Sequence, residues 1–173
     1  IKVGFANEMA NLCERLGADG RHIMRGIGLD HRIGTHFLQP GPGWGGSCFL
    51  KDTAALLSIA QEQSCPLRLV EAARLVNAEQ RHIVVRKLQT ALYVLRGKTI
   101  GILGVAFKAG TDDIRDSPSL EIIKILNESG AHLRVHDPVA LANYQPPVNS
   151  DIEIVSQVYD LAQGCDGLVI LTE

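Results

Sequence analysis

The sequence predicts an α/β protein in which an all-helical first part is followed by a doubly wound parallel sheet. Two observations support this class. Apolar residues recur at helical spacing through residues 1–96, and short apolar runs alternate with amphipathic stretches after Gly97. Strands that alternate with helices are typical of parallel β–α–β units. We therefore expect a helical central domain over residues 1–96 and a sheet domain over residues 97–173.

Two short helices are expected at the start of the chain. Apolar spacing predicts the first over residues 1–16, and Gly17 is placed to end it. Asp19 is a suitable N-cap for the second, which runs through Met24 and stops at the glycines of residues 26–28.

Two further helices are expected over residues 48–63 and 66–95, with Pro66 in the first turn of the second. The second spans roughly 30 residues, or about 45 Å at the α-helical rise. A helix this long usually bridges domains or subunits, so we expect a homodimer through residues 66–95.

The remainder of the chain alternates between strand and helix patterns. Strands are expected over residues 98–104, 132–138, 151–155 and 167–172. Helices are expected over residues 118–130 and 156–164, the second with a cap at Ser156. This order predicts a Rossmann-like, nucleotide-binding sheet.

The composition excludes several functional classes. Net charge is −2 and no basic patch is present, which speaks against a nucleic-acid partner. No apolar run reaches the roughly 18 residues of a membrane span, and the first residues do not form a signal peptide. The irregularly spaced cysteines, without a CxxC pair, indicate a reducing, cytoplasmic location. They are Cys13, Cys48, Cys65 and Cys165.

A glycine- and proline-rich loop lies at the centre of the helical part. Gly41, Gly43 and Gly46 have the spacing GxGxxG, but prolines interrupt the motif and no strand precedes it. A dinucleotide fingerprint is therefore disfavoured. A flexible loop is the simple alternative, although glycine also lets a ligand approach main-chain amides closely.

Cys48 follows this loop directly. With Ser47 as a helix N-cap, Cys48 falls in the first turn, where the helix N-terminus favours a thiolate. Lys51 adds positive charge, and Asp52 shares the same helix face. A thiolate beside a carboxylate suits covalent catalysis followed by activation of water. The alternative is a buried cysteine with a solvated aspartate.

Several segments resemble the UDP-glucose/GDP-mannose dehydrogenase family. GPGWGGSCFLKD (41–52) resembles its active-site segment, and GIGLDHRIG (26–34) resembles the segment upstream. GVAFKAGTDDIRDSPS (104–119) resembles a loop of its second nucleotide-binding domain, and HDP (136–138) and the closing LVILTE also match. Trp44 and Leu50 replace the Phe and Pro that are frequent in the family, so the shape of the loop is left open.

The resemblance implies oxidation of the C6 alcohol of a nucleotide sugar to a carboxylate, with NAD as cofactor. Cys48 would hold the intermediate as a thiohemiacetal and then a thioester, and Asp52 would position or activate water. The segment 26–34 favours the branch that converts UDP-glucose to UDP-glucuronate. GDP-mannose or UDP-N-acetylmannosamine oxidation is the alternative, as is a non-catalytic nucleotide-binding and dimerisation module.

The resemblance also implies binding residues. Those expected at the substrate are Arg32, Phe37, Leu38, Gln39, Gly41, Gly45, Phe107 and Lys108. Arg115 and Lys51 are expected at NAD. Each has a plain alternative: Lys108 as a solvated lysine, and Arg115 as part of an ion-pair cluster with the aspartates around it.

Other candidate residues have weaker support for a functional role. Asp137 at a strand end is compatible with a ribose contact or with turn chemistry. His31 and His36 lack metal-ligand spacing, so no metal is expected. Lys2 and Asn7 lie downstream of the family's catalytic Lys and Asn and receive no catalytic role. We expect the chain to be a fragment without the family's N-terminal NAD domain, inactive alone.

Overall fold

The computed structural model describes residues 1–172. Contacts divide the chain into two compact units. The first unit comprises residues 1–44 and 51–80, and the second comprises residues 45–50 and the chain from Arg81 onward. The domain boundary expected after residue 96 stays a prediction.

The first unit begins with helices α1 (Lys2–Leu16) and α2 (Gly20–Gly28). Gly17 ends α1 in the left-handed conformation, at φ 68°, and Asp19 caps α2 by accepting two backbone N–H groups. Both predictions are confirmed. The helix extends beyond Met24 and ends at Gly28, within the expected glycines, where a Cβ would lie 3.1 Å from the Cα atom of Thr35.

Helices α3 (Phe49–Glu62) and α4 (Arg68–Leu92) follow. Pro66 was expected in the first turn of α4, but it precedes that helix, because the Leu67 carbonyl accepts the first helical N–H bonds. The far end was also placed too late. Tyr93 adopts a positive φ of 64°, which ends the helix after 25 residues, or about 37 Å.

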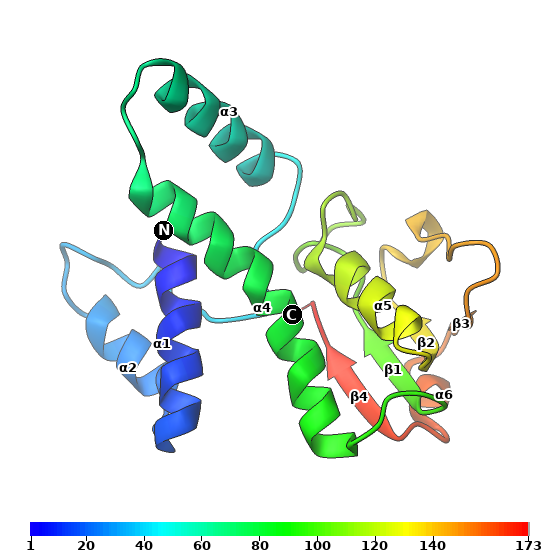
Figure 1. Cartoon of the computed structure of the whole chain (residues 1–173). Coiled ribbons are helices and arrows are strands. Elements are labelled where there is room, and N and C mark those ends of the chain that lie inside the picture. Colours follow the sequence, from blue (N-terminus) through cyan, green and yellow to red (C-terminus); the bar gives the residue numbers. More distant parts are fainter. Residues whose placement is uncertain (173) are drawn as a thin grey trace. The chain divides into compact units, whose positions relative to one another are not determined.

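The second unit is built on four parallel strands. They are β1 (Thr99–Leu103), β2 (His132–His136), β3 (Ile152–Ile154) and β4 (Gly167–Ile170), in the order β3-β2-β1-β4 (Figure 1). The parallel pairing confirms the predicted α/β class. Every predicted strand is present, with ends that differ by about two residues or less.

Each face of this sheet carries a helix. On one face, Ile100, Ile102 and Val135 belong to a buried core that includes residues of α5 (Pro118–Glu128) and the second half of α4. On the other face, α6 (Val158–Ala162) places Leu161 over Gly101, where an added Cβ would lie 2.8 Å from a Leu161 methyl carbon.

Two local features differ from the expectations for this unit. The N-cap of α6 is Gln157 and not Ser156, and it makes no side-chain cap hydrogen bond. A short 3₁₀ helix, η1 (Leu141–Asn143), was not predicted. None of the helices in the described part of the chain combines the length and the apolarity that a bilayer crossing requires.

Candidate functional site

The cysteine segment (residues 45–50) belongs to the second unit and packs against the β1–α5 loop (residues 104–117). A Cβ at Gly45 would lie 2.2 Å from the carbonyl oxygen of Asp116, and a Cβ at Gly46 would lie 2.9 Å from the ring of Phe107. Neither position has room for a side chain. These two glycines therefore let the cysteine segment pack closely against the β1–α5 loop.

Cys48 is exposed and immediately precedes α3. It was expected in the first turn, but the helix begins at Phe49, so Cys48 stands at the entrance to the helix. The Oγ atom of Ser47 lies 4.0 Å from its Sγ atom. Asp52 is in the first turn of α3, and the Nζ atom of Lys51 lies 3.6 Å from its Oδ1 atom. An exposed thiol at a helix entrance is accessible to a substrate.

Asp113 organises the β1–α5 loop. Its carboxylate accepts two hydrogen bonds in a fork from Arg115, with Nε 3.0 Å from Oδ1 and Nη2 2.7 Å from Oδ2. Its carbonyl oxygen accepts the backbone N–H of Phe107 at 3.1 Å. The hydrogen bonds from the Arg115 side chain and backbone lower the pKa of the Asp113 carboxyl to about 2. One aspartate thus fixes two of the expected binding residues.

Arg115 also interacts electrostatically with the cysteine segment. The hydrogen bond to Asp113 is the main cause that raises the pKa of the Arg115 guanidinium, and the charge of Asp113 comes next. Electrostatic interactions with Cys48 and Asp116 raise this pKa further. The Asp113 pair bears out the ion-pair alternative for Arg115 without excluding a ligand, since the guanidinium is largely exposed.

Lys108 lies beside Phe107 in the same loop. Its Nζ atom is 5.3 Å from the centre of the Phe107 ring, a cation–π distance. The two residues therefore present an aromatic ring and a positive charge together.

Asp137 anchors the β1–α5 loop from the end of β2. Its side chain is buried and accepts four backbone N–H groups, two from Val105 and Ala106 and two from Val139 and Ala140. Burial acts to raise the pKa of Asp137, but the four donors outweigh it, and the pKa falls below its ordinary value. Both oxygens are engaged, so turn chemistry is its role and no ribose contact is assigned.

Two buried asparagines hold the glycine loop in the first unit, and sequence reasoning missed both roles. The Oδ1 atom of Asn7 accepts the N–H of Gly41 at 2.8 Å. Asn77 accepts the N–H of Trp44 at 2.6 Å and donates to its carbonyl oxygen at 2.9 Å. Gly43 passes so close to Asn77 that a Cβ would lie 2.8 Å from its Oδ1 atom. A polar residue inside an apolar helical stripe was the available signal for Asn77.

The other expected substrate residues of the first unit stand in different surroundings. Leu38 is buried against Ala6 in a small core, so its side chain serves packing. Arg32 is exposed and forms a forked ion pair with Asp30, whose hydrogen bond raises the pKa of the guanidinium. Phe37 is exposed with a φ of 63°, and Gln39 is also exposed.

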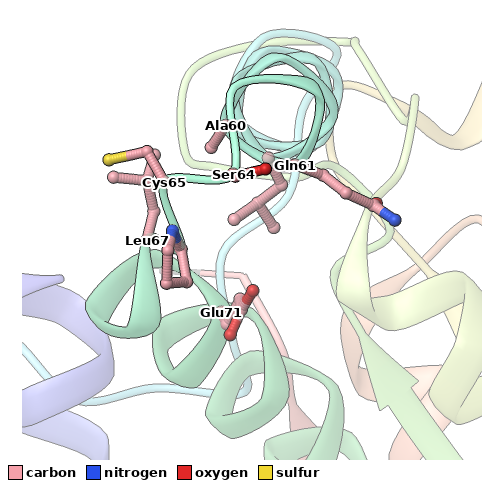
Figure 2. Close-up of a pocket in the computed structure, with 8 residues that line it drawn as sticks. Ala60, Gln61, Ser64, Cys65, Leu67 and Glu71 are labelled. Carbon is pink, nitrogen blue, oxygen red and sulfur yellow. The ribbon is translucent and has the colours of Figure 1, made fainter.

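A separate pocket of about 470 Å³ lies at the turn between α3 and α4 in the first unit (Figure 2). It is lined by Leu57, Ala60, Gln61, Ser64, Cys65, Pro66, Leu67 and Glu71. None of these was an expected site residue. Within residues 1–172, no three His, Cys, Asp or Glu side chains are grouped in a way that suits a metal ion.

Two family models match the chain. The model of the UDP-glucose/GDP-mannose dehydrogenase family, central domain, matches residues 1–79, and the model of the UDP binding domain of the same family matches residues 101–173.

Curated relatives and solved structures agree with these models. The UDP-glucose 6-dehydrogenase TuaD of Bacillus subtilis (strain 168) is 44% identical over 172 residues, which are 99% of this chain and 37% of the relative. The UDP-glucose 6-dehydrogenase of Rickettsia bellii is also 44% identical, over 99% of this chain and 40% of its own. The structure of a UDP-glucose dehydrogenase from Pyrobaculum islandicum superposes with a TM-score of 0.94 at 37% identity, over 99% of this chain and 40% of that one.

A more distant structure, the UDP-D-ManNAc dehydrogenase from Pyrococcus horikoshii, has a TM-score of 0.82 at 30% identity, over 99% of this chain and 38% of that one. The chain thus spans 37% to 40% of the length of these similar proteins.

Proposed function

Because this chain belongs to the UDP-glucose/GDP-mannose dehydrogenase family, we propose that it is part of an NAD-dependent enzyme that oxidises UDP-glucose at C6 to UDP-glucuronate. The observation that carries the proposal is the exposed Cys48, held at the entrance to α3 by close packing of Gly45 and Gly46. The choice of sugar is supported by the relatives, since those at 44% identity are named UDP-glucose 6-dehydrogenases.

In this proposal the Cys48 thiolate adds to the C6 aldehyde that the first hydride transfer produces. The S–C bond gives a thiohemiacetal, and loss of a second hydride converts it to a thioester. Water then attacks the thioester, the S–C bond breaks, and the carboxylate leaves while the thiol is restored. Asp52, in the first turn of α3, positions that water and accepts its proton.

NAD would supply the acceptor for each hydride. Arg115 and Lys51 fit a role beside it, because both side chains are largely exposed cations, a donor type that pairs with phosphates. We propose that most NAD contacts come from residues outside the two matched domains.

The substrate contacts are proposed on both units. Phe107 and Lys108 would meet the uridine and the sugar, and Gly41 and Gly45 would contribute through the backbone. Arg32, Phe37, Leu38 and Gln39 of the first unit are also proposed as substrate contacts, with Leu38 restricted to backbone contacts by its burial. A homodimer through residues 66–95 belongs to the same proposal.

Calorimetric titration of the 173-residue chain with UDP-glucose, beside GDP-mannose, tests the sugar. Binding of UDP-glucose alone supports the proposal, and binding of GDP-mannose alone moves the assignment to that nucleotide sugar. Alkylation tests the nucleophile. Cys48 should react with iodoacetamide faster than Cys65, which is also exposed. Equal rates would favour the non-catalytic binding module instead.

A further inference from the structure

The cysteine segment packs on the β1–α5 loop, which carries Arg115, and Cys48 is among the groups that interact electrostatically with Arg115. Gly45 lies against the carbonyl group of Asp116, the residue that follows Arg115. Asp116 has a φ of 52°, so the backbone turns sharply between Arg115 and the start of α5. Gly46 meets the ring of Phe107 on the same loop. Two glycine contacts therefore fix the loop carrying Arg115 relative to the segment carrying Cys48.

The guanidinium of Arg115 is held in place by hydrogen bonds. Its Nε atom lies 3.0 Å and 3.1 Å from the two oxygens of Asp113, and its Nη2 atom lies 2.7 Å from Oδ2. The Asp113 backbone N–H donates to Oγ1 of Thr111 at 3.2 Å, which ties this anchor to its own loop. A forked guanidinium pair fixes orientation as well as distance.

We propose that Arg115, held by Asp113, is a positioning residue whose positive charge stabilises the thiolate of Cys48. This inference rests on the proposed role of Cys48 as nucleophile. The thiol gives its proton to water, and the sulfur anion remains next to the fixed cation. No redox change is involved. The helix entrance at α3 also favours an anion there, so the arginine adds to an existing effect.

Other charged groups in these segments act in both directions. Asp113 and Asp116 oppose a thiolate, and Lys108 favours it; Lys51 and Asp52 follow Cys48 in the chain and form their own pair. The effect of Arg115 is expected to be moderate, because the side chains of Arg115 and Cys48 reach solvent.

The test is site-resolved alkylation of the 173-residue chain with iodoacetamide at pH 7, read by mass spectrometry. The attacking thiolate forms a carbon–sulfur bond and releases iodide. Arg115→Gln should slow the reaction of Cys48 by about 2- to 5-fold at low salt, the size expected for an exposed charge pair. Arg115→Lys should restore part of the rate. Arg86→Gln removes the same charge from an exposed position on α4 and should leave Cys48 unchanged.

Salt separates a charge effect from a structural one. At about 1 M salt the screening length falls to about 3 Å, so the difference between Arg115→Gln and the unaltered chain should shrink. A slowing that persists at high salt overturns the inference, as does an unchanged Cys48 rate in Arg115→Gln.

Asp113→Asn adds an independent test, since it removes a negative charge but loosens the guanidinium. Slower alkylation of Cys48 supports positioning, and faster alkylation contradicts it. Cys65 provides the internal reference in every sample. If Cys48 in the unaltered chain reacts no faster than Cys65, the proposed function fails as well; if Cys48 is fast but indifferent to Arg115, only this inference fails.

Discussion

Replacing Asp137 with asparagine should destabilise the second unit, although the change only exchanges one carboxylate oxygen for an NH₂ group. The carboxylate joins the loop after β1 to the turn after β2. It does so through two N–H groups at each oxygen: Oδ2 accepts from Val105 and Ala106 at 2.8 and 3.1 Å, and Oδ1 accepts from Val139 and Ala140 at 2.9 and 2.7 Å.

The magnitude follows from these four donors. Asparagine keeps one acceptor oxygen and turns an NH₂ group toward the other pair of N–H groups, so two backbone donors lose their partner. An unpaired buried donor costs about 1–3 kcal/mol, and hydrogen bonds to a charged acceptor are the stronger kind. We therefore expect Asp137→Asn to lower the free energy of unfolding of the second unit by about 2–4 kcal/mol.

Hydrogen exchange, read by mass spectrometry on peptides from β1 and β2, measures this loss within the second unit. Asp151→Asn is the matched control. Asp151 also lies next to a sheet strand, directly before β3, but it is exposed and pairs with His132, so a change within about 1 kcal/mol is expected. The reasoning is refuted if Asp137→Asn costs no more than the control.

The pH dependence of the stability of the second unit is a second test of the role of Asp137. The pKa of Asp137 is lower in the folded chain than its ordinary value of 3.8, although burial opposes this. The carboxylate therefore contributes stability that is present above about pH 4 and is lost as the pH falls through the lowered pKa. Asp137→Asn should remove this part of the acid sensitivity, whereas Asp151→Asn should keep it.

Three further predictions concern the loops and α2. Gly45→Ala places a Cβ 2.2 Å from the Asp116 carbonyl oxygen, so the cysteine segment must shift and the Cys48 alkylation rate should change; Gly41→Ala, which has open space, is the control. Asn77→Ala removes both hydrogen bonds to Trp44, so the emission of this single tryptophan should move to longer wavelength. Gly26→Ala, on the exposed side of α2, should raise the unfolding free energy by about 0.5–1 kcal/mol, measured by urea denaturation.

Local chemistry made most of the fold predictable. Gly17 ends α1 because glycine reaches the left-handed region without strain, and Asp19 begins α2 because a short carboxylate reaches free helical N–H groups. The parallel sheet followed from the alternation of element types. The end of α4 was not predictable in this way. Tyr93 carries a positive φ that its residue type disfavours, so only the surrounding structure places the break there.

The candidate site shows the same difference between features that local sequence encodes and features that depend on distant contacts. Helical spacing identified Cys48 together with Asp52, and the family resemblance identified Arg115; their roles remain predictions. The packing of the cysteine segment against the loop that carries Arg115 depends on contacts between segments far apart in the chain, which no local spacing encodes. The roles of Asn7 and Asn77 in holding the glycine loop were missed for a related reason: their partners are backbone groups of that loop, and a backbone group leaves no trace in the sequence.

The glycines of the loop lead to a different conclusion in the structure than in the sequence. Their number suggested a backbone that a ligand approaches closely. Three of them are required by the protein itself: Gly43 by Asn77, Gly45 by Asp116, and Gly46 by the ring of Phe107. Only Gly41 among the four has open space where a Cβ would lie, and its N–H is already donated to Asn7. The glycine content is therefore explained first by intramolecular packing. A ligand needs the shape that this packing produces, so substitutions at Gly45 and Gly46 should act on the position of Cys48 before they act on any backbone contact to a substrate.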